Sequence, residues 1–193
     1  FTEKVNELSQ ELMPDIVLAE PVGSCTDLIA TIFKPIQLNF TRQFSLGPLS
    51  IVVDPKRVRK LMMECNSQRE ASNLFPSEIN YLFRKQLEEA DIIVLNKIDK
   101  ISPEEVQAVI SFLNSEFPSV EVVTASAKEG LGIENWISRI DNFEVTDKSS
   151  LSIDYETYAR AEEFLGWLNS SVIVSSDNPH DGNKFISNLM ETI

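Results

Sequence analysis

The chain has 193 residues, 42% of them hydrophobic, and carries a formal net charge of −13. This length suits one domain with a sizeable core, with room for part of a second. A strongly acidic chain lacks the positive surface that nucleic acids and anionic membranes attract, so we expect neither as a partner. No apolar run approaches the roughly 18 residues of a spanning helix. Two cysteines without metal or disulfide spacing favour a reducing, cytoplasmic setting.

The first fifty residues alternate short helical and strand patterns. Hydrophobic periodicity predicts, in chain order, an amphipathic helix, a buried strand, a loop, a helix and a second strand, over residues 1–13, 15–19, 20–23, 24–33 and 49–53. Pro14 ends the first helix, because proline lacks the backbone N–H that a helix interior needs. Asp54 and Pro55 close the second strand.

The middle of the chain continues this alternation with longer helices. Helices are predicted over residues 56–65, 75–90, 102–117 and 133–140, and strands over residues 92–95 and 120–124. The third of these helices has the clearest start, because Ser102 can cap it, Pro103 suits its first position and two acidic residues follow. Strands that alternate with helices imply an α/β fold of three layers, with a parallel sheet between helices.

The C-terminal part follows a polar linker, residues 142–153. Beyond it we predict a helix, a strand and a helix, over residues 155–168, 172–174 and 181–193. These elements are too few for an independent core. We therefore divide the chain into a domain (1–141), a linker (142–153) and a part (154–193) that either packs on the domain or begins a second one.

The most informative stretch is the apolar strand 92–95 followed by Asn-Lys-Ile-Asp, which ends at Asp99. A carboxylate at the end of a parallel strand can accept two hydrogen bonds from the neighbouring N–H donors of guanine, a donor pair that adenine lacks. Such a charge-assisted, two-point contact is strong and selective, and a site built for those donors rejects a base without them. The alternative is a solvated turn in which Asp99 caps the next helix.

A second strand pattern, residues 120–124, leads into Ser126, Ala127 and Lys128. Together, the two strand-and-loop segments resemble the guanine-specificity motifs of P-loop GTPases. The resemblance implies that the second segment completes the base site, with the backbone N–H of Ala127 meeting the guanine oxygen.

The same resemblance assigns roles to the first segment. It implies that Asp99 recognises the base, that Lys97 lays its aliphatic stem along the ring, and that Asn96 braces the loop. The cofactor implied is GTP or GDP, and the fold implied is that of a G domain.

A third motif, Glu20-x-x-Gly23, follows the first predicted strand. Most GTPases have Asp-x-x-Gly at this point, and glutamate there resembles the CobW/HypB/UreG family of metal-chaperone GTPases, as do residues 86–99 and 126–132. The resemblance implies that Glu20 supports a Mg²⁺ ion and that the Gly23 N–H meets the γ-phosphate, so both would serve catalysis. The alternative is an exposed loop carboxylate that caps the next helix.

The chain departs from this family in one respect, since it contains no Gly-x-x-x-x-Gly-Lys-Ser/Thr phosphate loop and no Cys-x-Cys-Cys metal motif. The phosphate loop cradles the phosphates with backbone N–H groups and a lysine. In the family both motifs precede Glu-x-x-Gly. We therefore expect this chain to be the C-terminal portion of a larger GTPase, and we expect no GTP hydrolysis from the chain alone.

The function implied by the resemblance is GTP-dependent delivery of a metal ion, or of a metal-bearing cofactor such as a corrinoid, to a client enzyme, with a homodimer possible. GTP would order the loop after Glu20, and hydrolysis would release it. One alternative is a GTPase of translation or ribosome assembly, although Asp-x-x-Gly and a basic surface are missing. The other is a degenerate G domain that serves as a non-catalytic scaffold or partner-binding module.

Two further expectations concern the region around Glu20. In such GTPases the strand that leads into the phosphate loop lies between the strands that correspond here to residues 16–19 and 51–53. We expect a neighbouring molecule or an upstream segment to occupy that place, rather than direct pairing of the two strands or a poorly ordered 16–19 segment, because buried strand edges need partners. Cys25 is interpreted as a small core residue, with a metal or redox role left open.

Overall fold

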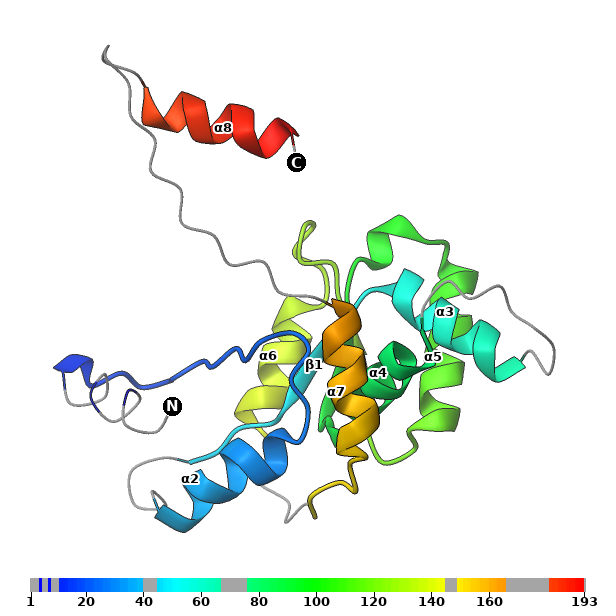
Figure 1. The fold of residues 1–193 in the computed structure, drawn as a ribbon, viewed down its shortest axis with the longest axis horizontal. Helices are drawn as coiled ribbons and strands as arrows, with labels where there is room; N and C mark the ends of the chain where they lie inside the picture. The colour runs from blue at the N-terminus through cyan, green and yellow to red at the C-terminus, as the bar shows by residue number, and fades with distance from the viewer. Residues whose placement is uncertain are drawn as a thin grey trace.

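The computed structural model describes residues 4, 7, 11–39, 45–66, 76–144, 149–165 and 181–192. Among these residues a parallel sheet of three strands forms in the order β1-β2-β3, from Ser50–Val53, Ile92–Leu95 and Glu121–Thr124 (Figure 1). The predicted parallel sheet is confirmed, since β1 pairs in parallel with β2 and β2 in parallel with β3. Their registers place the ends of all three strands at the same edge, because Val53 pairs with Leu95 and Leu95 with Thr124.

The helices alternate with the strands, as the sequence predicts. In chain order the described helices are η1 (Ile29–Phe33, a π-helix), α2 (Lys34–Asn39), α3 (Pro55–Asn66), α4 (Ser77–Glu89), η2 (Ile98–Lys100, a 3₁₀-helix), α5 (Pro103–Glu116), α6 (Ile133–Asp141), α7 (Tyr155–Leu165) and α8 (Gly182–Thr192). None of these described helices is long and apolar enough to cross a membrane.

Helix α5 shows how closely local signals set an element boundary. The Ser102 hydroxyl accepts a hydrogen bond from the backbone N–H of Glu105, and the Glu105 carboxylate accepts one from the Ser102 N–H. This capping box satisfies two backbone donors that the helix itself leaves unpaired. Pro103 occupies the first turn at no cost in hydrogen bonds, so the predicted start at Ser102 is confirmed.

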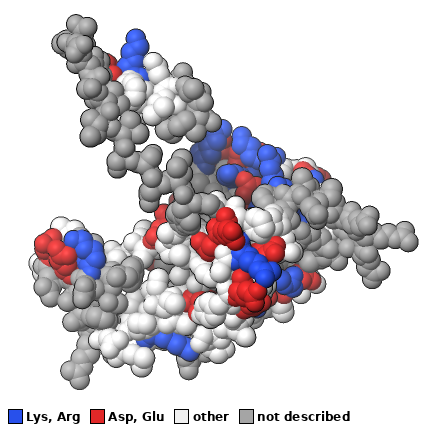
Figure 2. Space-filling model, viewed as in Figure 1, with Lys and Arg blue, Asp and Glu red and all other residues white. Residues whose placement is uncertain are grey.

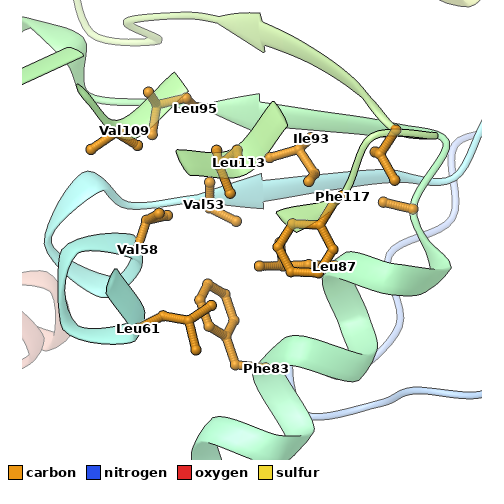
Figure 3. Close-up of a cluster of buried hydrophobic side chains, with 12 residues drawn as sticks. Val53, Val58, Leu61, Phe83, Leu87, Ile93, Leu95, Val109, Leu113 and Phe117 are labelled. Carbon is orange, nitrogen blue, oxygen red and sulfur yellow. The ribbon is translucent and has the colours of Figure 1, made fainter. Parts of the chain in front are cut away.

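One face of the sheet packs against α3, α4 and α5. The cluster in this layer includes Ile93 and Leu95 of β2, both fully buried, with Val58, Leu87 and Leu113 from the three helices (Figure 3). These side chains point toward one another between the sheet and the helices. The layer is the main hydrophobic core, and it holds β2 rigidly at the centre of the sheet.

The other face of the sheet is covered by α6. Val94 and Val123 pack there with Trp136, whose indole Nε1 donates to the Ser50 hydroxyl at 3.1 Å. Helices on both faces of a parallel sheet give the three-layer α/β architecture that the sequence predicts. Cover is incomplete over β1, since Val52 lies on the α6 face and remains 52% exposed.

Residues 15–19 differ from the prediction, because they form no strand and are exposed. Ile16 and Leu18 are 69% and 87% exposed. An apolar run becomes a strand only when a sheet edge provides hydrogen-bond partners for its backbone, and these residues join none of the described strands. The predicted buried strand at 15–19 is therefore wrong, and direct pairing of 16–19 with β1 does not occur.

The helix predicted over residues 24–33 begins later and extends further along the chain in the structure. Residues 23–27 form a turn and loop, and the helical path begins at Leu28 and continues as η1 and α2. Leu28 and Ile29 are buried, as predicted, and pack with Leu49. The predicted helix over 1–13 lies mostly outside the described residues.

The part beyond the linker packs on the domain through α7. Helix α7 lies along α4, with Ala161 fully buried (Figure 1). The backbone N–H of Asp154 donates to the Tyr81 hydroxyl of α4 at 2.7 Å. Helices α7 and α8 lie where helices are predicted, and the strand predicted at 172–174 falls outside the described residues.

Candidate functional site

The ends of β2 and β3 position the predicted site residues side by side. The Asn96 N–H donates to the Val53 carbonyl at 3.0 Å, and the Ala125 N–H donates to the Leu95 carbonyl at 2.9 Å. The Ile98 N–H then donates to the Ala125 carbonyl at 3.2 Å. Backbone hydrogen bonds therefore tie the loop after β2 to the loop after β3, and the Asn-Lys-x-Asp and Ser-Ala-Lys segments meet at one sheet edge.

The Asn96 side chain joins these two loops. Its Oδ1 accepts from the Lys97 N–H at 2.8 Å and from the Ala127 N–H at 3.0 Å. One side-chain oxygen thus fixes a tight turn in its own loop and the path of the neighbouring one. The structure places Asn96 as a brace, and directs the Ala127 N–H toward it.

Asp99 and Ser126 form the second link between the loops. The Ser126 hydroxyl donates to Asp99 Oδ1 at 2.6 Å, and Ser126 is fully buried. The hydrogen bond from Ser126, assisted by the positive charges of Lys100 and Lys128, holds the pKa of the Asp99 carboxyl below its ordinary value against the opposing effect of desolvation. Asp99 is therefore ionised at neutral pH and acts as a charged acceptor.

Lys97 lies on the opposite side of its loop from the Ser126 contact. Its backbone has φ +61°, in the left-handed region that lysine rarely adopts. Its ammonium lies 3.0 Å from Asp54 Oδ2, at the end of β1. The other basic residue predicted for the site, Lys128, is exposed and lies 3.2 Å from the Glu129 carboxylate.

Gly132 shapes the loop after β3. It has φ +75°, and a Cβ built on it would lie 2.0 Å from the Thr124 carbonyl oxygen. A side chain cannot be accommodated at that distance, so glycine lets the loop return tightly against β3. Ser126 and Leu131 exchange backbone hydrogen bonds at 2.9 and 3.1 Å, which closes the loop around Ala127 and Lys128.

Glu20 and Gly23 are the residues predicted to meet Mg²⁺ and the γ-phosphate. Their surroundings differ from those of the loops after β2 and β3. Both are exposed, and within the described ranges no hydrogen bond or ion pair involves the Glu20 side chain. The Gln86 amide of α4 donates to the carbonyl oxygens of Gly23 and Cys25 at 2.8 and 2.9 Å. Helix α4 thus positions the Gly23 turn, whereas among the described residues no hydrogen bond or ion pair joins Glu20 to the loops after β2 and β3.

Behind that turn lies a buried polar group that sequence reasoning missed. Asp27 is 7% exposed, has φ +60°, and its Oδ2 accepts from the Tyr155 hydroxyl of α7 at 2.6 Å. Within the described residues its Oδ1 and the Thr26 Oγ1 have no hydrogen-bond partner although both are buried. Tyr155 is 128 positions away, so the only sequence signal for Asp27 was its place directly before the apolar run that begins at Leu28.

Glu89 is a second buried acid near the same segment. It is 2% exposed, and its Oε1 accepts from the Ile29 N–H at 2.7 Å, at the first residue of η1. Burial raises the pKa of Glu89, although hydrogen bonds from the backbone of Ile29 and Leu28 oppose that effect. The Glu89 carboxyl thus accepts from a backbone N–H at the start of a helix, a donor that the helix itself leaves unpaired.

A metal site requires a set of oxygen, nitrogen or sulfur ligands. Among the described residues no group of three or more His, Cys, Asp or Glu side chains has the geometry to hold a metal ion. Mg²⁺ in nucleotide sites takes only one or two carboxylates and completes its shell with water and phosphate oxygens. The exposed Glu20 carboxylate fits that need in its chemistry, as a single hard oxygen donor.

Basic side chains gather at the sheet edge beside acidic ones. Figure 2 shows Lys and Arg atoms gathered at the end of the domain where the loops after the strands lie. Lys97, Lys100 and Lys128 are exposed on those loops. Each of these ammonium groups lies beside a carboxylate, since Lys97 contacts Asp54, Lys128 contacts Glu129 and Lys100 lies 3.7 Å from Asp99 Oδ2. The lysines therefore balance the local acidic groups, in a chain of net charge −13.

Comparison with known proteins gives one result. Residues 1–123 match the family model described as CobW/HypB/UreG, nucleotide-binding domain. No curated protein and no solved structure matches the chain. The matched range includes Glu20, Gly23 and the Asn96–Asp99 loop, and ends before Ser126. Since it covers well over half of the chain, this protein belongs to the CobW/HypB/UreG family, a family of nucleotide-binding proteins of the metallochaperone type.

Proposed function

We propose that the loops after β2 and β3 bind the guanine base of GTP or GDP. The observation that carries this proposal is the Asp99 carboxylate, held by the buried Ser126 hydroxyl and kept ionised beside Ala127. Guanine offers two adjacent N–H donors to such a carboxylate and one oxygen to a backbone N–H. Adenine offers neither in that arrangement, so the site would discriminate between the two bases.

The Ala127 N–H already donates to Asn96 Oδ1 at 3.0 Å. A guanine oxygen would share that donor in a three-centre hydrogen bond, a geometry that backbone N–H groups commonly adopt. Lys97 would lie along the ring with its aliphatic stem, Lys128 would flank the base site, and the exposed lysines nearby would attract the phosphates. These residues bind and orient the nucleotide, and none of them transfers a proton.

For the phosphate side we propose that Glu20 supports a Mg²⁺ ion and that the Gly23 N–H meets the γ-phosphate. A bound Mg²⁺ would neutralise charge that develops on the phosphate oxygens. The Gln86 amide fixes the Gly23 and Cys25 carbonyls, and so orients the turn that bears the Gly23 N–H. Glu20 and the turn would become ordered by GTP and relax after hydrolysis in the intact protein.

The cellular role that fits this family is assistance in delivering a metal ion, or a corrinoid cofactor, to a client metalloenzyme or corrinoid protein in the cytoplasm. GTP hydrolysis would require a phosphate loop, which this sequence does not contain, so we expect none from the chain alone. Residues 154–193 would extend the domain, since α7 packs on α4. Exposure of Glu20 favours a second candidate, a non-catalytic scaffold that binds partners.

Asp99→Asn tests the proposal. Asparagine reverses part of the donor and acceptor pattern, so the variant should prefer xanthine over guanine nucleotides in competition binding on the full-length protein. Asp141→Asn, an exposed carboxylate at the end of α6, is the matched control and should retain the preference for GDP. An Asp99→Asn protein that still prefers GDP to XDP would show that Asp99 does not bind the base.

A further inference from the structure

Lys97 combines an unfavourable backbone with a well-defined side-chain contact. Its φ of +61° is one of three positive values found at non-glycine residues within the described ranges. Glycine or asparagine would adopt this conformation at lower cost. The lysine side chain is therefore the feature to be explained, and its ammonium lies 3.0 Å from Asp54 Oδ2.

Asp54 is itself fixed in place. Its Oδ1 accepts from the Lys56 N–H at 2.8 Å, and its carbonyl accepts from the Arg57 and Val58 N–H groups at 2.9 and 3.2 Å, so it caps the start of α3. Partial burial acts to raise the pKa of Asp54, but hydrogen bonds from Lys97 and the Lys56 backbone hold it below its ordinary value. One carboxylate thus caps a helix with one oxygen and contacts Lys97 with the other.

The sheet register explains why these residues meet. Val53 pairs with Leu95, and the Asn96 N–H donates to the Val53 carbonyl, so the residue after each strand lies beside the other. Asp54 therefore holds the Lys97 side of the loop from β1, while Ser126 holds the Asp99 side from β3. Asp54 therefore pairs with Lys97, whereas Asp99 pairs with Ser126 and has the Lys100 ammonium 3.7 Å from its Oδ2.

We propose that Asp54 is a positioning residue for nucleotide recognition, which keeps the Lys97 stem extended at the edge of the base site and keeps the Lys97 ammonium away from Asp99. This inference rests on the proposed function. Lys97 is two residues from Asp99, and an ammonium released from Asp54 could pair with the Asp99 carboxylate. The Lys97 ammonium would then compete with the guanine N–H donors for Asp99, and the Lys97 stem would lose its fixed direction.

Asp54→Asn isolates the charge, because asparagine caps a helix as well as aspartate does. For full-length protein titrated with fluorescent GDP, we expect the Kd to rise about threefold, the effect of a partly exposed ion pair. The preference for GDP over XDP should be unchanged. Glu105→Gln, which removes the half-exposed pair with Arg59 and retains the capping box, is the matched control and should not alter the Kd.

A double-mutant cycle shows whether Asp54 acts through Lys97. Lys97→Met keeps the apolar stem and removes the charge, so adding Asp54→Asn to it should cause no further loss. Asp54→Ser, which also caps α3, repeats the test if Asp54→Asn lowers the melting temperature.

The outcomes separate this inference from the proposed function. An unchanged GDP Kd in Asp54→Asn, or an equal further loss in the Lys97→Met background, overturns the positioning role even if Asp99→Asn prefers XDP. Parent protein that binds no GDP, or an Asp99→Asn variant that still prefers it, overturns the proposed base site, and the positioning role with it.

Discussion

The loops after β2 and β3 and the segment 20–27 are held in opposite ways. In the first region Asn96 Oδ1 accepts from the Ala127 N–H, and Asp99 accepts from the Ser126 hydroxyl, so the loops after two neighbouring strands are joined twice. In the second, Glu20 is exposed and Asp27 is buried in a left-handed conformation, and one Asp27 carboxylate oxygen has no hydrogen-bond partner among the residues that the structure describes. The parallel strands of the main core position the loops after β2 and β3, whereas segment 20–27 depends on contacts from α4 and α7. The loops after β2 and β3 are therefore fixed independently of segment 20–27.

The largest expected effect on stability comes from truncating a core side chain next to the loop after β2. Leu95→Ala removes a fully buried side chain directly before Asn96, and should lower the free energy of unfolding by about 2–5 kcal/mol. Val52→Ala, at a 52% exposed position of β1, should cost less than about 1 kcal/mol. Urea denaturation of both variants provides the comparison. If both variants lost the same free energy of unfolding, the buried position of β2 would contribute no more to stability than the exposed position of β1.

Gly132→Ala should have the next largest effect. Its Cβ would meet the Thr124 carbonyl at 2.0 Å in a left-handed conformation, so we expect a loss of roughly 2–3 kcal/mol and a displaced Ser126–Ala127 loop. Gly130→Ala has φ +70° but nothing within 4 Å of the new Cβ, and should cost only about 1 kcal/mol. Thermal unfolding measures both. Matching losses would show that the close contact in the structure is not maintained in solution.

Glu89 gives the segment 28–33 a dependence on pH. Because burial raises the pKa of its carboxyl, the folded protein binds this proton more tightly than the unfolded chain does. The free energy of unfolding should therefore fall as the pH rises from the unfolded value, near 4.5, through the raised folded value. Glu89→Gln should flatten that slope and retain an acceptor for the Ile29 N–H. Glu134→Gln, on exposed α6 surface, is the control, and a slope that persists in Glu89→Gln would assign it to another group.

The smallest effect concerns Asp99 itself. Removing the Ser126 hydroxyl with Ser126→Ala should let the pKa of the Asp99 carboxyl rise toward its ordinary value, since this hydrogen bond is the main cause of the lowering. Stability from this bond is present above the unfolded pKa and is lost as the pH falls through the lowered folded one. NMR titration of the carboxyl carbon measures the change. Ser138→Ala on α6 should leave the Asp99 titration as it is, and an unshifted Asp99 in Ser126→Ala would contradict the assigned cause.

Sequence by itself determined the features that depend on neighbours within a few residues. Ser102, Pro103 and Glu105 define the start of α5 because a capping box is made within one turn. The apolar run 92–95 predicts a strand buried on both faces. The Asn96–Asp99 motif directly after it predicts side chains that meet the loop after the next strand, Asn96 at Ala127 and Asp99 at Ser126, because parallel strands bring their ends to one edge.

Tertiary structure alone decided the features that depend on distant partners. Residues 16–19 have the composition of a strand, but a strand exists only beside a partner edge, and the described sheet offers them none. The Asp54–Lys97 pair, the Asp27–Tyr155 hydrogen bond and the Glu89 contact with Ile29 join residues 43 to 128 positions apart. No local pattern predicts such pairs, because the packing of whole helices and strands brings their members together. Local chemistry thus determined which side chains could recognise a base, and the sheet determined which of them are held in place.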